Sequence, residues 1–281
     1  MSRRTLATPA EVQGVGLHLG LPCRLRFTSA VAGSGRTFVR MDLPGAPEFR
    51  ANAASAVLAE RRTQLGEGEG ALHPVEHVLS AVAGAGVDDL RIEMDGPEPP
   101  IMDGSAAPFL DALVAAGFEE QPGAPSVLTL AEPVVVEDGE SRYEAHPADR
   151  LELDVTIEFP HPLIGVQRWV GEITPDVYSS ELAAARTFGF VHEVEYLRSR
   201  GLIQGASTEN AVVLDVETAG LVGCELRWPD EFVRHKAMDC VGDLALAEAR
   251  IHARVVAVRP SHRGTVLLVR EMVRQGMLAA A

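Results

Sequence analysis

Lysine is almost absent from this sequence. Of the 25 basic residues, 24 are arginine, and Lys236 is the single lysine. The basic residues are also outnumbered, because 40 aspartate and glutamate residues leave a formal net charge of −15. An acidic surface of this kind repels a polyanionic backbone. The composition therefore excludes a nucleic-acid-binding protein that relies on a basic surface.

Cysteine and long apolar runs are scarce as well. The three cysteines are widely spaced and form no Cys-x-x-Cys pair, which argues against a disulfide framework and predicts a reduced, intracellular protein. Residues 1–12 contain arginines but no apolar segment after them, so they do not resemble a secretory signal. The longest nearly apolar stretch covers about residues 78–87, whereas a membrane-spanning helix needs about 20 apolar residues. We therefore expect a cytoplasmic protein with no integral membrane segment.

Strand and helix patterns occur in both halves of the chain. Alternation and apolar stripes predict, in the first half, strands at 23–27, 37–41 and 90–94 and helices at 74–84 and 106–117. In the second half they predict a hairpin of 133–137 with 142–145, strands at 151–159, 211–215 and 254–258, and helices at 191–200 and 230–249. In the strand 151–159 we expect the charged residues, including Asp154, to face solvent.

A segment rich in proline and glycine, residues 121–126, is the best linker candidate. Each half therefore contains sheet segments followed by helices, which indicates an α+β fold of two layered halves of similar make-up. We expect domains at 1–121 and 126–281.

The most informative motif runs from Arg234 to Asp243. On a helix, residues four apart share a face, so His235 and Asp239 can converge on one metal ion. Asp243 lies about 12 Å from His235 along the helix axis, which is too far to share that metal easily. It could instead orient another residue, such as a histidine from elsewhere. Taken alone, the motif also fits a solvated histidine–aspartate pair on an amphipathic helix.

Glu76 and His77 lie near the start of the predicted helix 74–84. Neighbouring side chains on a helix point about 100° apart, so one can bind a metal while the other faces a water molecule. An isolated Glu-His pair is common and usually carries no function. Together with His235 and Asp239, however, the pair completes two histidines and one carboxylate with an open fourth position, as in catalytic zinc sites.

His262 lies in a segment rich in turn-forming residues and is flanked by Arg259 and Arg263. We expect a loop histidine, which could act as a cationic acid or stabilise an anion. An ordinary surface histidine is the alternative. His18 is a weaker candidate, because the glycines around it allow close backbone approach but match neither a dinucleotide-binding fingerprint nor a P-loop.

Five segments along the chain resemble one family. They are Gly14 to His18, Val75 to His77, Pro100 to Phe109, Ala185 to Phe190 with 195–202, and Asp230 to Lys236 with Asp239. In this order and over nearly the whole chain, they resemble the UDP-3-O-acyl-N-acetylglucosamine deacetylases, zinc-dependent enzymes of lipid A biosynthesis. The Met-Asp-Gly-Ser-Ala-Ala-Pro-Phe and Arg-Thr-Phe-Gly-Phe runs are the most specific.

The resemblance implies a role for each matching residue. One Zn²⁺ ion, or Fe²⁺ in its place, would have three ligands: His77, His235 and Asp239. Glu76 would be the general base that activates water. His262 would be the protonated group that stabilises the oxyanion and gives a proton to the leaving amine, and Asp243 would orient it. Thr187 would donate its hydroxyl to the oxyanion.

The resemblance also implies a small-molecule substrate, a UDP-sugar that carries an acyl chain. Lys236 would contact it near the metal, Phe188 would pack near the sugar or nucleotide, and Arg259 stands where the family usually has a diphosphate-binding lysine. An insert at about 191–207 would line an apolar passage for the acyl chain, with Val191, Val194 and Ser207. We also expect that basic residues near these positions in sequence gather positive charge around the site: Arg186, Arg234, Lys236, Arg259 and Arg263.

The implied activity is hydrolysis of the N-acetyl group of UDP-3-O-(3-hydroxyacyl)-N-acetylglucosamine, which releases acetate. The implied fold is two α+β domains packed face to face with the site between them, and we expect a monomer. Two alternatives remain open. A zinc-free acyltransferase of the His-x-x-x-Asp type would explain His235 and Asp239 but leave Glu76, His77 and His262 idle. The other alternative is a non-catalytic protein that keeps the fold.

Overall fold

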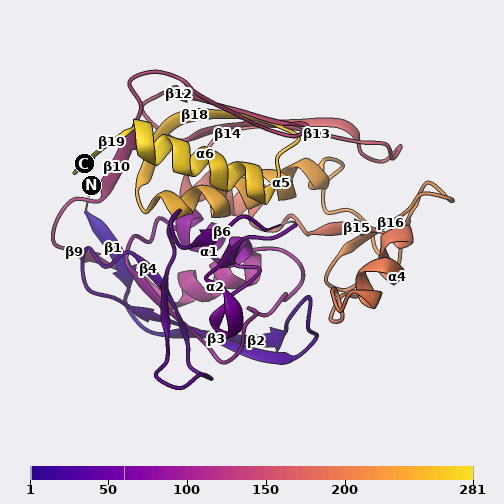
Figure 1. Ribbon diagram of the computed structural model, residues 1–281, viewed down its shortest axis with the longest axis horizontal. Coiled ribbons are helices and arrows are strands. Elements are labelled where there is room, and N and C mark those ends of the chain that lie inside the picture. The colour runs from indigo at the N-terminus through magenta and orange to yellow at the C-terminus, as the bar shows by residue number, and fades with distance from the viewer. Residues whose placement is uncertain (1, 60, 281) are drawn as a thin grey trace.

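The computed structural model describes residues 2–59 and 61–280, which form two large β-sheets with helices packed between them and three smaller sheets. Figure 1 shows the layers as sheet, helices, helices and sheet, from top to bottom. The N- and C-terminal ends lie close together at one end of these layers. The α+β class expected from the sequence is confirmed.

The first half of the chain forms a five-stranded sheet. Its strands, in spatial order, are β2 (Ala10–Val15), β3 (Pro22–Ser29), β8 (Leu90–Met94), β4 (Arg36–Arg40) and β5 (Glu48–Arg50). Only β4 and β8 run parallel. The helices α1 (Glu76–Gly84) and α2 (Ala107–Ala116) belong to this half. Smaller elements are β1 (Arg3–Leu6) paired with β9 (Phe118–Gln121), β6 (Ala56–Val57) paired with β7 (Gln64–Leu65), and η1 (Gly68–Gly70).

The second half forms a seven-stranded sheet. One path through it is β11 (Val134–Asp138), β12 (Ser141–Pro147), β18 (Arg250–Val258), β10 (Ser126–Thr129) and β19 (Met277–Ala280). β13 (Glu152–Phe159) also pairs with β18 and with β14 (Gly165–Glu172). The helices of this half are α3 (Pro175–Val177), η2 (Tyr178–Leu182), α5 (Glu231–Leu244), η3 (Ala245–Ala247) and α6 (His262–Gln275).

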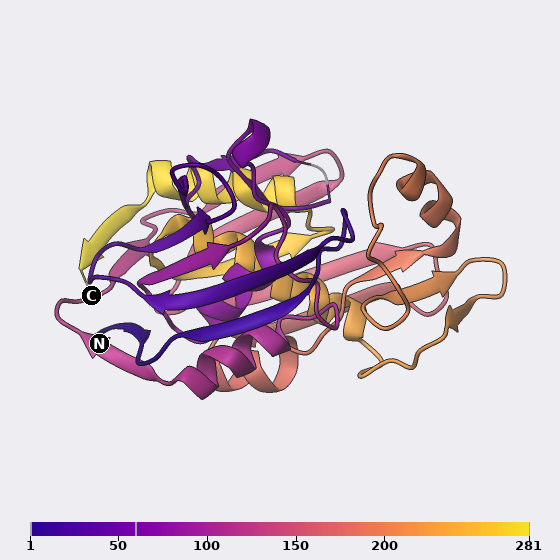
Figure 2. The ribbon, with the colours of Figure 1, turned by 90° about the horizontal axis from the view of Figure 1, so that it is seen from below.

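A smaller unit stands off from one end of the two sheets, as Figure 2 shows. It consists of β15 (Phe188–Phe190), α4 (Val191–Ser199), β16 (Val212–Asp215) and β17 (Gly220–Val222). The helix expected at 191–200 is confirmed. No residue of α4 is buried, so this helix is held at the surface of the molecule.

Apolar periodicity explains most of these elements. In β3, Cys23, Leu25 and Phe27 are buried while Arg24 and Arg26 are exposed, as an alternating strand on a core requires. The strand predicted at 90–94 is β8, with the same bounds. Among the described residues, no helix has both the length and the apolar character needed to cross a membrane.

Four local predictions are wrong. The helix expected at 230–249 ends at Leu244, and β18 begins at Arg250 rather than at residue 254, because Ile251 and Ala253 are buried on the sheet. The loop expected around His262 is the start of α6, where the Ser261 side chain accepts a hydrogen bond from the Gly264 backbone. Asp154 is buried under two arginines from neighbouring strands, Arg168 and Arg254.

Candidate metal and catalytic site

The site is built where α1 packs against α5, between the two halves of the chain. These helices approach closely because residue 242 is glycine. A Cβ atom at Gly242 would lie 2.1 Å from the backbone oxygen of Glu76 and 3.1 Å from the backbone nitrogen of Ser80. The small residue therefore lets Glu76 and His77 come within reach of the side chains of α5.

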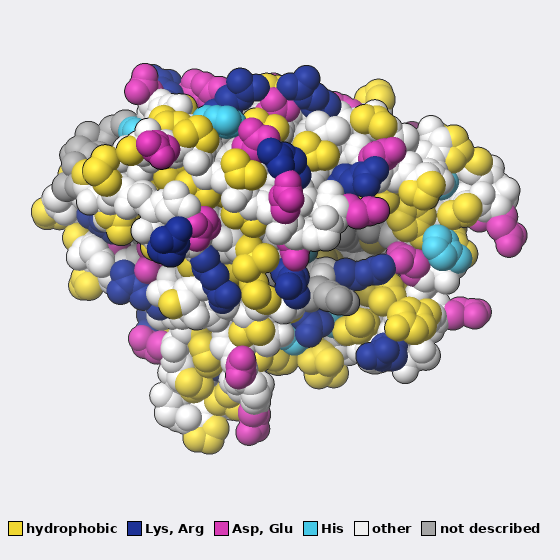
Figure 3. Space-filling view, turned by 45° about the horizontal axis from the view of Figure 1, so that its top comes forward, with side chains coloured by type: hydrophobic (Ala, Val, Ile, Leu, Met, Phe, Trp, Pro, Cys, Tyr) yellow, Lys and Arg dark blue, Asp and Glu magenta, His cyan; other side chains and the backbone are white. Residues whose placement is uncertain are grey.

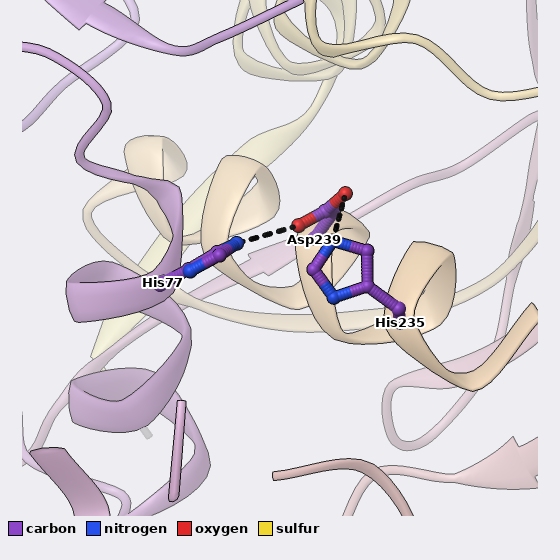
Figure 4. Close-up of side chains that lie close together, drawn as sticks. All are labelled: His77, His235 and Asp239. Atoms are coloured by element: carbon purple, nitrogen blue, oxygen red, sulfur yellow. Dashed lines mark ion pairs between the residues drawn. The ribbon is translucent and has the colours of Figure 1, made fainter. Parts of the chain in front are cut away.

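Three side chains form a candidate metal site in this contact. His77 comes from α1, and His235 and Asp239 come from α5 one turn apart (Figure 4). Asp239 Oδ1 is 3.5 Å from His77 Nε2, and Asp239 Oδ2 is 3.4 Å from His235 Nε2. One ligand atom of each residue lies within 4.8 Å of the others. The spacing expected for His235 and Asp239 thus places them on one face, with His77 opposite.

The protonation states of His235 and Asp239 favour binding of a cation. The backbone oxygen of Ala185 accepts a hydrogen bond from His235 Nδ1 at 3.1 Å, which leaves Nε2 to face Asp239. Burial lowers the pKa of His235 to about 3, so the ring is neutral. Burial alone would raise the pKa of Asp239, but His235, Lys236 and His262 hold it well below the usual range. Asp239 Oδ1 is buried and has no hydrogen-bond partner among the described residues.

These observations fit a divalent metal. Two histidines and one carboxylate are the donor set of many catalytic zinc sites, and the unpaired oxygen of Asp239 is a buried acceptor that a cation would satisfy. The backbone contact of His235 fixes its tautomer, as partners of metal-binding histidines do.

A second group of titratable side chains lies beside the first. The imidazole of His262, at the first residue of α6, lies between two carboxylates. Its Nδ1 is 3.0 Å from Asp243 Oδ2, and its Nε2 is 3.6 Å from Glu76 Oε1. The same Nε2 is 3.8 Å from Asp239 Oδ2, so both groups belong to one site.

The charges of this second group follow from burial and from one another. Burial alone would lower the pKa of His262, but the negative charges of Asp243, Glu76 and Asp239 outweigh it and raise the pKa to about 9. Burial raises the pKa of Glu76 and of Asp243. His262 therefore carries a proton near neutral pH, with a carboxylate facing each ring nitrogen.

A cavity of about 270 Å³ opens above these residues. Its walls include Thr187, Phe188 and Lys236 from the expected set, together with Phe159 and Phe190. Lys236 Nζ donates to Asp239 Oδ2 at 2.9 Å and lies 5.9 Å from the centroid of the Phe188 ring. Burial alone would lower the pKa of Lys236, but the charge of Asp239 raises it. The cavity thus has an aromatic wall and one ammonium group beside the metal ligands.

The remaining expected substrate residues lie elsewhere. Arg259 is at the end of β18 and pairs with Glu140 at 3.1 Å and with Glu158. Val191 and Ser207 are exposed, and Val194 is half-buried on α4. None of the four is among the described residues that line the cavity.

The arginines expected to gather around the site also have other partners. Arg186 is paired with buried Glu231, Arg234 with Asp230 and Glu181, and Arg263 with Asp138. Like Arg259, they do not line the cavity. Of the expected group of basic residues, Lys236 lines the cavity, whereas the four arginines pair with carboxylates outside its lining.

Sequence reasoning missed two features of the site. Arg61 and Glu193 line the cavity, and Arg61 Nη2 donates to Glu193 Oε1 at 2.6 Å, which joins the first half of the chain to α4. Thr63 is fully buried against Glu76, Asp243 and His262. None of these three residues belongs to a motif, and their contacts join separate segments of the chain, so no local pattern could reveal them.

Comparisons with known proteins give one family for nearly the whole chain. A family model described as UDP-3-O-acyl N-acetylglycosamine deacetylase matches residues 3–274. A protein of Thermosynechococcus vestitus named UDP-3-O-acyl-N-acetylglucosamine deacetylase is 42% identical over 274 residues, which cover 98% of this chain and 95% of the relative. A protein of the same name from Bdellovibrio bacteriovorus is 41% identical over 271 residues, 96% of this chain and 89% of the relative.

Proposed function

Because the chain belongs to the UDP-3-O-acyl-N-acetylglycosamine deacetylase family, we propose that it hydrolyses the N-acetyl group of UDP-3-O-(3-hydroxyacyl)-N-acetylglucosamine and releases acetate. The protein is then a metal-dependent amide hydrolase of the committed step of lipid A biosynthesis. One observation carries the proposal: the His77, His235 and Asp239 ligand set lies beside Glu76 and a protonated His262.

Zn²⁺ is the metal that we propose for the three ligands, and Fe²⁺ is the alternative that the same donors would accept. When bound, the metal supplies a Lewis acid that polarises an amide carbonyl and lowers the pKa of water to about 7. The histidine and aspartate ligands differ in the atom that each would offer to the metal. His77 and His235 would bind through their Nε2 atoms, and Asp239 would bind through its carboxylate.

Glu76 acts as the general base in this proposal. Its Oε2 accepts a hydrogen bond from the backbone nitrogen of Thr63 at 3.0 Å, so Oε1 is the oxygen turned toward His262 and the metal ligands. Burial raises the pKa of this carboxyl, which makes it a stronger base than an exposed glutamate. Oε1 accepts the proton of the attacking water.

His262 acts as the general acid. Asp243 holds Nδ1, so the proton on Nε2 points toward the reacting group. This N–H stabilises negative charge on the amide oxygen and then passes its proton to the leaving amine nitrogen. Thr187, on the cavity wall, donates its hydroxyl to the same oxygen. A donor of this kind is typically worth about 10²–10³ in rate.

The remaining residues bind the substrate. Lys236 contacts it next to the metal ligands and Phe188 packs on the sugar or nucleotide. We assign the acyl chain to the insert 191–207 with Val191, Val194 and Ser207. Arg259 would reach the diphosphate after leaving Glu140 and Glu158. The protein would work as a cytoplasmic monomer with domains at 1–121 and 126–281, and without a nucleic-acid partner.

An assay of acetate release tests the proposal. The purified chain is incubated with UDP-3-O-(3-hydroxyacyl)-N-acetylglucosamine, and metal content is measured on the same sample. We expect one metal ion per chain, loss of turnover with a chelator, and recovery when Zn²⁺ is added back. An acyltransferase of the His-x-x-x-Asp type would instead hold no metal, release no acetate and be insensitive to the chelator.

A further inference from the structure

Thr63 is the residue that contacts both carboxylates flanking His262. It is fully buried in the segment just before β7. Its backbone nitrogen donates to Glu76 Oε2 at 3.0 Å, and its hydroxyl donates to Asp243 Oδ1. The same hydroxyl oxygen is 3.4 Å from His262 Nδ1. One small side chain thus lies at the centre of the acid–base group.

We propose that Thr63 is a positioning residue that fixes the carboxylates of Glu76 and Asp243 relative to the His262 ring. Its hydroxyl orients Asp243, and its backbone N–H orients Glu76. The inference rests on the proposed function, because it assigns Glu76 and His262 their roles as base and acid. Thr63 itself touches no reacting atom.

The hydroxyl of Thr63 fixes the plane of the Asp243 carboxylate. Rotation about the terminal bond of an aspartate is only weakly restricted, so one hydrogen bond leaves the group free to turn. Here both oxygens are held, Oδ1 by Thr63 and Oδ2 by His262 Nδ1. Without the hydroxyl, Oδ1 would be left buried without its donor, which favours rotation of the carboxylate and misdirects the Nε2 proton of His262.

The backbone of Thr63 is tied to the start of α1. The backbone nitrogen of Val75 donates to the Thr63 oxygen at 3.1 Å, while the Thr63 nitrogen holds Glu76. The hydroxyl therefore has a fixed position relative to α1, although Asp243 lies on α5 and His262 on α6. Thr63 connects the three helices that supply the acid–base group.

Side-chain variants separate the two contacts, because every variant keeps the backbone N–H. Thr63→Val has the same shape without the hydroxyl, and Thr63→Ser keeps it. We expect Thr63→Val to lower kcat by about 10- to 100-fold, with KM and metal content unchanged, and Thr63→Ser to remain within a few-fold of the wild type. Thr5→Val is the matched control: Thr5 is also buried, but its hydroxyl donates to a backbone oxygen far from the site. Its kcat should stay at the wild-type value.

A double-mutant cycle then tests the route of the effect. If the hydroxyl acts through Asp243, Thr63→Val should cost almost nothing in kcat when Asp243→Asn is already present. The proposal is overturned if Thr63→Val keeps the wild-type kcat, or if Thr63→Ser loses as much kcat as Thr63→Val. It is also overturned if Thr63→Val lowers kcat by the same factor in the wild type and in Asp243→Asn. A loss that tracks metal content would also overturn it, since that indicates a structural role.

A measurement without turnover keeps the test independent of the assigned activity. The Nδ1–H proton of His262 is buried against Asp243, and its NMR signal can be assigned by its absence from His262→Gln. On metal-free protein we expect the signal in the wild type and Thr63→Ser, and its loss or broadening in Thr63→Val. An unchanged signal in Thr63→Val would refute the positioning role. Absence of acetate release from the wild type would refute the proposed function alone.

Discussion

At the scale of single residues, two histidines of the site have opposite pKa shifts because their surroundings differ. His235 is buried with one backbone partner and stays neutral, as a metal ligand must be. His262 is buried between carboxylates and stays protonated, as an acid must be. Environments that push pKa values apart in this way are the usual means of dividing acid, base and ligand roles within one site.

The pH dependence of turnover follows from these environments. In the proposed mechanism, Glu76 must have lost its proton and His262 must carry one, so kcat/KM should rise with pH on the acid side and fall on the alkaline side. Burial raises the pKa of Glu76, and the surrounding carboxylates raise that of His262 to about 9. A pH–rate profile of the metal-loaded enzyme should be bell-shaped, and an alkaline limb that persists in His262→Gln would contradict the assignment.

The sequence predicts the three candidate metal ligands that the structure brings together, but it does not predict their surroundings. His235 and Asp239 follow from helix periodicity, since they are four residues apart on α5. Glu76 and His77 were joined to them by resemblance and by the chemistry of the donor set. Thr63 was missed because its contact to Asp243 spans 180 positions and it stands in no recognisable pattern.

At the scale of elements, apolar periodicity predicts most strands and helices correctly in type but not always in their ends, as β18 and α5 show. Signals that turns share with helix starts are misleading. The helix α6 was missed because Pro260, Ser261 and Gly264 resemble a turn. Ser261 is in fact the N-cap, and Gly264 is required because Tyr143 packs over it: a Cβ there would lie 2.6 Å from the Tyr143 hydroxyl oxygen. That hydroxyl also accepts from Ser261 N at 2.7 Å. Gly264 is needed because of Tyr143 on β12, so the sequence around residue 264 could not indicate why a glycine stands there.

The contact between α1 and α5 should be sensitive to one methyl group. Gly242→Ala would place a Cβ against the backbone of Glu76 and push the helices apart, which costs about 1–3 kcal/mol or more. His77 would then move away from Asp239, and metal affinity should fall. Denaturant unfolding and metal titration measure both effects.

Gly96→Ala is the control for this substitution. The nearest atom to a Cβ at Gly96 would be Cys23 Cβ at 4.0 Å, an ordinary contact. This variant should unfold and bind metal almost as the wild type does. Wild-type stability and metal affinity in Gly242→Ala would show that the helices do not need the glycine.

At the scale of the whole molecule, the two sheets lie outside and the helices inside, so the halves meet helix to helix. This arrangement buries the ligands between α1 and α5 and leaves charged side chains on the outer surfaces. Figure 3 shows basic side chains interspersed with acidic ones over the visible face. The net charge of −15 is therefore spread over a surface where most arginines have acidic neighbours, while the single lysine lies at the cavity.

In the proposed mechanism, His77, His235 and Asp239 hold the metal, while Glu76 accepts the proton of the attacking water. The most direct measurement compares metal content and acetate release in Glu76→Ala and His235→Ala. We expect Glu76→Ala to keep its metal ion but lose nearly all turnover, and His235→Ala to lose both. Wild-type turnover in Glu76→Ala, or undiminished metal content in His235→Ala, would contradict the account.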